Sequence, residues 1–138
     1  MKAPIAVRAS ATIATLLLIV ALSVVPGQAR SGDSAFVWLV SVTPEQLQNV
    51  AHVFAYALLA WLMVWTLENL YPPRHRNALA FALAVIAGAG LEWYQTLVPG
   101  RFGTFTDALL NAGGALFGLL IAATILKPRA RSSSKISH

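Results

Sequence analysis

Four long apolar stretches, set apart by short segments rich in proline, glycine and charge, form the main hydropathy pattern of the chain. They cover residues 9–25, 50–67, 78–98 and 108–126. Glu92 is the only Asp, Glu, Lys or Arg residue within them. About 20 apolar residues in a helix cross the ~30 Å hydrocarbon core of a bilayer. The pattern therefore predicts an all-α fold, an integral membrane bundle of four transmembrane helices that forms one domain over residues 1–126.

Basic residues predict the orientation of these helices, because loops rich in Lys and Arg stay on the cytoplasmic side. With a cytoplasmic N-terminus, only Arg30 and Arg101 of the ten basic residues face outward. The other eight then lie inside: Lys2, Arg8, Arg74, Arg76, Lys127, Arg129, Arg131 and Lys135. Both termini are expected in the cytoplasm, and residues 127–138 are expected to form a basic, disordered tail.

Composition agrees with a membrane protein and excludes several other classes. The chain is 57% hydrophobic and 11% charged, whereas a soluble domain has roughly 25% charged residues. The net charge of +5 would suggest nucleic acid in a soluble protein, but these charges belong to the inner membrane surface, so no nucleic acid is expected. With no cysteine, the chain has no disulfide, no thiolate catalysis and no Cys-based metal site.

The first apolar stretch has two possible interpretations. Lys2 and Arg8, the apolar run over residues 11–25, and the small residues Gly27 and Ala29 also fit a cleavable signal peptide. Because three further spans follow, retention as the first transmembrane helix is the favoured prediction. Cleavage would leave three spans with unchanged orientation.

The outer connection over residues 28–47 contains a short apolar run over residues 35–40. This run is too short to cross the membrane and is expected at the outer interface or as a shallow re-entrant segment. Thr43, Pro44 and Gln46 fit an N-cap, a proline at the first helical position and a capping-box glutamine. The second long helix is therefore expected to begin before its apolar stretch.

The few polar residues inside the last three stretches all fall near their outer ends. Members of each pair are three or four residues apart and so share one helix face. These pairs are His52 with Tyr56, Glu92 with Gln95, and Asp107 with Asn111, and Arg101 lies in the loop before the last stretch. Three helices and one loop thus bring polar groups to one membrane level, which predicts a polar pocket open to the outer leaflet.

Glu92 has the largest energetic consequence of these residues. A charged acid at the centre of a membrane helix costs ~2.5–3.5 kcal/mol, against roughly 2.5–5 kcal/mol gained from the eight Leu, Ile, Phe and Val residues of its stretch. The side chain must face the bundle interior, reach outward, pair with Arg101 or His52, or be protonated. A loop-fastening ion pair with Arg101 is the structural interpretation, and a functional site is the alternative.

Structural and functional interpretations also stand side by side for the other polar residues. His52 fits a general base, a headgroup donor or a donor between helices. Asp107 fits a capping box with Thr104, Asn111 fits a bond between helices, and Arg101 fits a forked donor to phosphate or carboxylate.

Small residues predict where helices approach closely. Gly114 and Gly118 form a GxxxG pattern, and Ala84 and Gly88 form a similar pair of small residues. No metal site and no cofactor are expected, because the chain lacks HExxH, CxxC and a glycine-rich phosphate loop. His52, Glu92 and Asp107 also lack a helical ligand spacing.

Two segments resemble the VanZ-like family of small bacterial membrane proteins. The first is residues 49–56, and the second has the order Glu92, Gln95, Arg101, Asp107, Asn111 and Gly114. This chain has Asn49 where the family usually carries a Lys, which weakens any role that needs a cation there. The resemblance implies a multi-pass protein of the bacterial inner membrane. The family is named for a protein that lowers susceptibility to teicoplanin, so it also raises a possible effect on that susceptibility.

Three functional hypotheses follow, and none predicts an oligomeric state. In the first, the protein binds or processes a membrane lipid headgroup or a lipid-linked cell-envelope precursor. In the second, it is a hydrolase or transferase that uses acid-base chemistry of His52 and Glu92. In the third, it is a structural or accessory subunit. The candidate catalytic residues are His52, Glu92 and Asp107, and the candidate ligand-binding residues are Tyr56, Gln95, Arg101 and Asn111.

Overall fold

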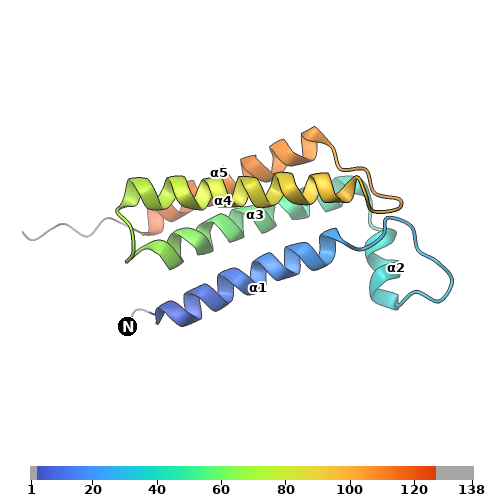
Figure 1. Cartoon of the computed structure of the whole chain (residues 1–138), viewed down its shortest axis with the longest axis horizontal. Helices are drawn as coiled ribbons and strands as arrows, with labels where there is room; N and C mark the ends of the chain where they lie inside the picture. The colour runs from blue at the N-terminus through green and yellow to red at the C-terminus, as the bar shows by residue number, and fades with distance from the viewer. Residues whose placement is uncertain (1–2, 127–138) are drawn as a thin grey trace, which may run out of the picture.

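The computed structural model describes residues 3–126, which form four long helices and one short helix (Figure 1). In chain order these are α1 (Ile5–Ser23), α2 (Ala35–Ser41), α3 (Glu45–Leu67), α4 (Pro73–Gln95) and α5 (Phe105–Ile125). The four long helices coincide with the four predicted spans, and the all-α prediction is confirmed. The predicted basic tail over residues 127–138 lies outside the described residues.

Local sequence explains where α4 and α5 begin. Pro73 occupies the first turn of α4. A backbone N–H at this position has no partner within the helix, so its absence in proline costs no hydrogen bond. Thr104 caps α5 by accepting a hydrogen bond from the Asp107 backbone N–H. The capping box predicted for α3 is wrong, because Pro44 is the N-cap and no side chain caps this end. The Thr43 hydroxyl instead donates to the Leu39 carbonyl at 2.8 Å, at the end of α2.

α3 is the central helix and packs against α1, α4 and α5. Its closest approach is to α5, at the predicted GxxxG pair. A Cβ atom on Gly114 would overlap the Val53 carbonyl, and a Cβ atom on Gly118 would overlap the Ala57 carbonyl. The core beside this contact consists of small residues, among them Ala60, Ala84 and Ala115, each 0% exposed. The packing between α3 and α5 therefore requires glycine, which has no Cβ atom, at positions 114 and 118.

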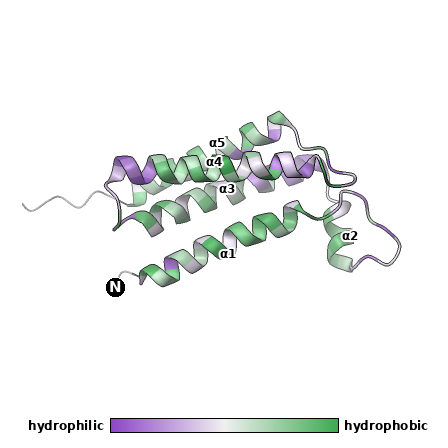
Figure 2. Ribbon diagram, in the orientation of Figure 1, coloured by the Kyte–Doolittle hydropathy of each residue, from purple (hydrophilic) through white to green (hydrophobic). Residues whose placement is uncertain are grey.

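The outer surfaces of the long helices are apolar. Leu17 on α1, Phe54 on α3, Ile86 on α4 and Leu116 on α5 are all more than half exposed. Figure 2 shows the hydrophobic character along the middle of the bundle and the hydrophilic segments near its ends. All four helices are long and apolar enough to cross a membrane. The chain is thus a multi-pass membrane protein whose exposed apolar side chains face lipid.

The two ends of the bundle are formed by different segments (Figure 1). One end, here called the basic end, contains the start of α1, the connection between α3 and α4, and the end of α5. There the buried Arg8 guanidinium donates to the Trp65 carbonyl at 2.9 Å and to the Glu68 carboxylate at 3.2 Å. It also lies 5.1 Å from the Trp65 ring centroid. Arg8, which the sequence offered only as a marker of orientation, joins α1 to α3.

The opposite end, here called the α2 end, contains α2, the end of α1, the start of α3 and the loop between α4 and α5 (Figure 1). The predicted apolar run over residues 35–40 forms most of α2, none of whose residues is buried. Gly27, just after α1, donates its backbone N–H to the Pro99 carbonyl at 3.2 Å. This bond ties the end of α1 to the loop between α4 and α5. Cytoplasmic termini, retention of α1 and the interfacial position of α2 stay predictions.

Candidate functional site

Glu92 lies at the centre of a polar group near the α2 end of the bundle. Its side chain comes from α4 and is buried, with the residue 5% exposed. One carboxylate oxygen, Oε1, accepts a hydrogen bond from Asn111 Nδ2 of α5 at 2.9 Å. The same oxygen lies 3.7 Å from His52 Nδ1 of α3, which is an ion-pair distance when His52 is protonated. Polar side chains of α3 and α5 therefore meet at one carboxylate on α4.

Several polar atoms in this group have no partner in the protein. Four of the five buried side-chain atoms without a hydrogen bond in residues 3–126 belong here: His52 Nδ1, Glu92 Oε2, Gln95 Nε2 and Asn111 Oδ1. Buried polar groups are almost always hydrogen-bonded, to protein or to water. Their concentration around one carboxylate indicates a place that water or a ligand completes.

A cavity of about 210 Å³ adjoins this group and is lined mainly by polar residues. His52, Glu92 and Gln95 reach it from α3 and α4, and Asp107 reaches it from the first turn of α5. Glu45, Asn49 and Gln48 line it from the start of α3. We call it the polar cavity. The expected lysine position near the start of α3 is occupied by Asn49, which brings an amide and no positive charge to this wall.

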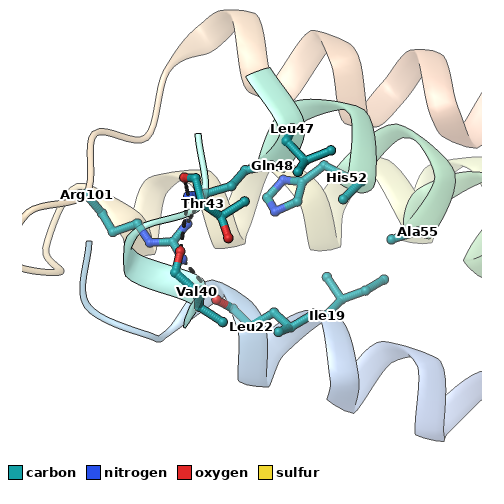
Figure 3. Close-up of a pocket in the computed structure, with 10 residues that line it drawn as sticks. Ile19, Leu22, Val40, Thr43, Leu47, Gln48, His52, Ala55 and Arg101 are labelled. Atoms are coloured by element: carbon teal, nitrogen blue, oxygen red, sulfur yellow. Dashed lines mark hydrogen bonds between the residues drawn. The ribbon is translucent and has the colours of Figure 1, made fainter. Parts of the chain in front are cut away.

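A second cavity of about 190 Å³ lies between α1, α2 and α3 and is lined mainly by apolar residues (Figure 3). Ile19 and Leu22 come from α1, Val40 from α2, and Leu47 and Ala55 from α3. We call it the apolar cavity. Four residues line both cavities, namely Thr43, Gln48, His52 and Arg101. The polar and apolar cavities are therefore neighbours that share a wall.

Arg101 does not form the ion pair with Glu92 that the sequence suggested, and the ion pairs within residues 3–126 do not include it. Its Nε donates to the Val25 carbonyl at 3.0 Å and its Nη2 to the Leu22 carbonyl at 3.2 Å. Its Nη1 donates to Gln48 Oε1 at 2.8 Å (Figure 3). The reason is physical: carbonyls at the end of α1 lack intrahelical partners and form the negative end of the helix dipole.

These three bonds make Arg101 a clamp between the loop that carries it, the end of α1 and the start of α3. Burial lowers the pKa of the Arg101 guanidinium, and the negative charge of Glu92 opposes that lowering. The group stays charged, as arginine does in proteins. Since three of its five N–H groups bind the protein, at most two remain for a bound molecule.

Two other predicted site residues have mainly structural surroundings. Tyr56 is 1% exposed, packs with Ile19 and Leu59 in the core, and lines neither cavity. Asp107 accepts a hydrogen bond from the Thr104 hydroxyl at 2.6 Å, while its own N–H donates back to that hydroxyl at 3.1 Å. The predicted capping interaction is thus present, although Asp107 also lines the polar cavity.

Sequence reasoning missed Gln48 and Thr43, which line both cavities. Gln48 Nε2 donates to the Thr43 carbonyl at 2.8 Å and so holds the segment before α3 against the site. A signal for Gln48 was present, because it lies four residues before His52 and on the same helix face. Among the described residues, no three His, Asp or Glu side chains are grouped as metal ligands.

Comparison with known proteins identifies a family for the chain. No curated protein and no solved structure matches the chain. A family model described as VanZ/LLP1 matches residues 4–127, a region that includes all four long helices and every residue of both cavities. Together with the four membrane-spanning helices, this match shows that the chain belongs to the VanZ/LLP1 family.

Proposed function

We propose that this protein binds an amphipathic molecule of the cell envelope, either a membrane lipid or a lipid-linked precursor. The observation that carries the proposal is the shared wall between the polar and apolar cavities, formed by Thr43, Gln48, His52 and Arg101. A headgroup would occupy the polar cavity, while the first part of its hydrocarbon chain would occupy the apolar cavity between α1 and α3. Ligand sites typically combine an apolar lining with a few polar groups that fix orientation.

The position of the two cavities supports an approach from the membrane. The apolar cavity is lined by Ile19 and Ala55, from the parts of α1 and α3 that lie within the predicted spans. Because hydrocarbon chains are stable in this layer, a lipid can reach the cavity without leaving the bilayer. The positive-inside pattern would place the α2 end at the outer face, so the proposed ligand belongs to the outer leaflet.

Filling the apolar cavity is expected to remove the bound molecule. In Ala55→Phe, the ring would occupy space that we assign to a hydrocarbon chain, and we expect bound lipid to fall about tenfold or more. Lipids that copurify with the full chain in mild detergent would be identified and quantified by mass spectrometry. The matched control is Ala89→Phe, the same change on an exposed position of α4. Equal lipid content in both variants would contradict the proposal.

A second candidate function is acid-base chemistry on the bound headgroup. The observation in its favour is Glu92 Oε2, a buried and unpartnered carboxylate oxygen within a group that includes His52. A carboxylate and an imidazole in one site are a common general acid and base pair. The pair would serve hydrolysis or group transfer, as an alternative to binding alone.

His52→Gln separates binding from catalysis. The amide keeps polar atoms in the wall but cannot exchange a proton at neutral pH. If the protein is an enzyme, conversion of a lipid extract by the reconstituted wild type should fall by a factor of about 100 or more, with lipid still bound. Absence of any conversion by the wild type would reject the enzyme hypothesis and leave the binding proposal intact.

A link to teicoplanin susceptibility would follow from one class of the proposed ligands. A lipid-linked cell-wall precursor is an amphipathic molecule of the proposed kind, and its binding in the bacterial inner membrane would connect the protein to teicoplanin susceptibility. That connection depends on the ligand's identity. Identification of the copurified molecule by mass spectrometry tests it, because an ordinary membrane lipid alone would remove its basis.

A further inference from the structure

We infer that the headgroup bound in the polar cavity carries a positively charged ammonium group. This inference rests on the proposed function and adds the chemical class of its ligand. Glu45, Glu92 and Asp107 bring three carboxyl groups to the cavity wall, against the single guanidinium of Arg101. The lining is therefore acidic in balance, although the chain as a whole is basic, with a net charge of +5.

The positive charge of Arg101 is already used by the protein. Two of its nitrogens donate to the carbonyls of Leu22 and Val25, and the third donates to Gln48. Those bonds direct the guanidinium toward the negative end of the α1 dipole. Arg101 is the one Lys or Arg residue in the lining, so the carboxyl groups across the cavity have no other permanent cation to pair with, and only His52 lies at ion-pair distance from Glu92, at 3.7 Å.

The unpartnered atoms in the site are mostly acceptors. Glu92 Oε2 is an acceptor when the carboxyl group is ionised, and neutral His52 can accept at Nδ1. An ammonium group has three N–H donors and no acceptor, so it matches these atoms. Hydrogen bonds from a cation to a carboxylate are shorter and stronger than neutral ones.

Burial makes Glu92 the central contact for the ammonium group. The residue is 5% exposed and lines the cavity, while Asn111 holds its other oxygen at 2.9 Å. A buried carboxylate needs a paired charge or several donors to offset its desolvation. A headgroup with only negative charge would instead place like charges beside three carboxyl groups, which opposes binding.

The test compares lipids with identical acyl chains and different headgroups. Full-length protein, stripped of bound lipid in detergent, would be mixed with equal amounts of phosphatidylethanolamine and phosphatidylglycerol, and bound lipid quantified by native mass spectrometry. We expect phosphatidylethanolamine to be retained about tenfold over phosphatidylglycerol, a factor that corresponds to 1.4 kcal/mol.

Removal of one carboxyl charge should reduce this preference. Glu92→Gln and Glu45→Gln each change a carboxylate of the cavity to a neutral amide, and both should lower the preference by a factor of about three. Glu45 is exposed at the start of α3, so its variant also covers the case in which Glu92→Gln fails to fold. The matched control, Asp33→Asn, removes an exposed acid outside both cavities and should retain the full preference.

The outcomes separate this inference from the proposed function. Equal retention of both lipids, or preference for phosphatidylglycerol, would overturn the ammonium headgroup while lipid binding itself stands. A preference that Asp33→Asn lowers as much as Glu45→Gln does would also overturn it. Binding of neither lipid, or binding that Ala55→Phe leaves unchanged, would instead reject the proposed function.

Discussion

Gly118→Ala is expected to destabilise the bundle by about 3 kcal/mol or more. The added Cβ atom would overlap the carbonyl of Ala57 on α3. Because that obstacle is backbone within a helix, no side-chain rotation can relieve the overlap, and α3 and α5 must move apart. Thermal unfolding in detergent, followed by the fluorescence of the four tryptophans, would report this loss as a much lower Tm.

Gly113 provides a matched control in the same helix. A Cβ atom there would meet nothing within 4 Å. Gly113→Ala should therefore keep the packing, and the better helix propensity of alanine favours it by up to about 1 kcal/mol. A Tm at or above that of the wild type is expected. If Gly118→Ala also melted like the wild type, the close contact between α3 and α5 would be wrong.

Arg101→Ala is expected to lower the free energy of unfolding by about 3 kcal/mol, since hydrogen bonds to charged groups contribute roughly 1.5–3 kcal/mol each and water replaces part of what is lost. The substitution removes all three bonds of the clamp between the loop, α1 and Gln48. The structure predicts lower stability together with loss of lipid, because the clamp forms part of both cavity walls.

Two comparisons make the Arg101 result specific. Arg101→Lys keeps the charge but has no planar fork, so it should recover only part of the lost Tm. Arg30→Ala removes an exposed arginine from the connection between α1 and α2, and it should change stability by less than about 0.5 kcal/mol. Hydrogen exchange over residues 22–27 should increase in Arg101→Ala. An unchanged exchange rate and Tm would show that Arg101 does not hold α1.

The spans could be predicted because their signal is local and repeated. An uninterrupted apolar stretch of sufficient length needs no information about its neighbours. The same holds for Gly114 and Gly118, whose spacing on α5 already implied a close helix contact. Glu92 and Asn111 could be placed at one membrane level by counting residues, and the structure joins them by a hydrogen bond of 2.9 Å.

The Arg101 clamp and the contacts of Arg8 could not be predicted, because most of their acceptors are backbone carbonyls. Every residue has such a group, so nothing in the sequence singled out Leu22 and Val25 as partners of Arg101. The same applies to Arg8, which donates to the carbonyls of Ala3 and Trp65. The apolar cavity was missed for a related reason. Its wall combines α1 and α3 with Val40 of α2, and only the packing of these helices reveals it.

The most direct test of an amphipathic molecule spanning the two cavities is photocrosslinking with an acyl chain that carries a diazirine. The protein would be reconstituted with this lipid, irradiated and mapped by peptide mass spectrometry. Crosslinks concentrated at Ile19, Leu22 and Ala55, and lost in Ala55→Phe, are the predicted result. Crosslinks spread evenly over the exposed faces at Leu17, Ile86 and Leu116, with none in the apolar cavity, would contradict a chain bound there.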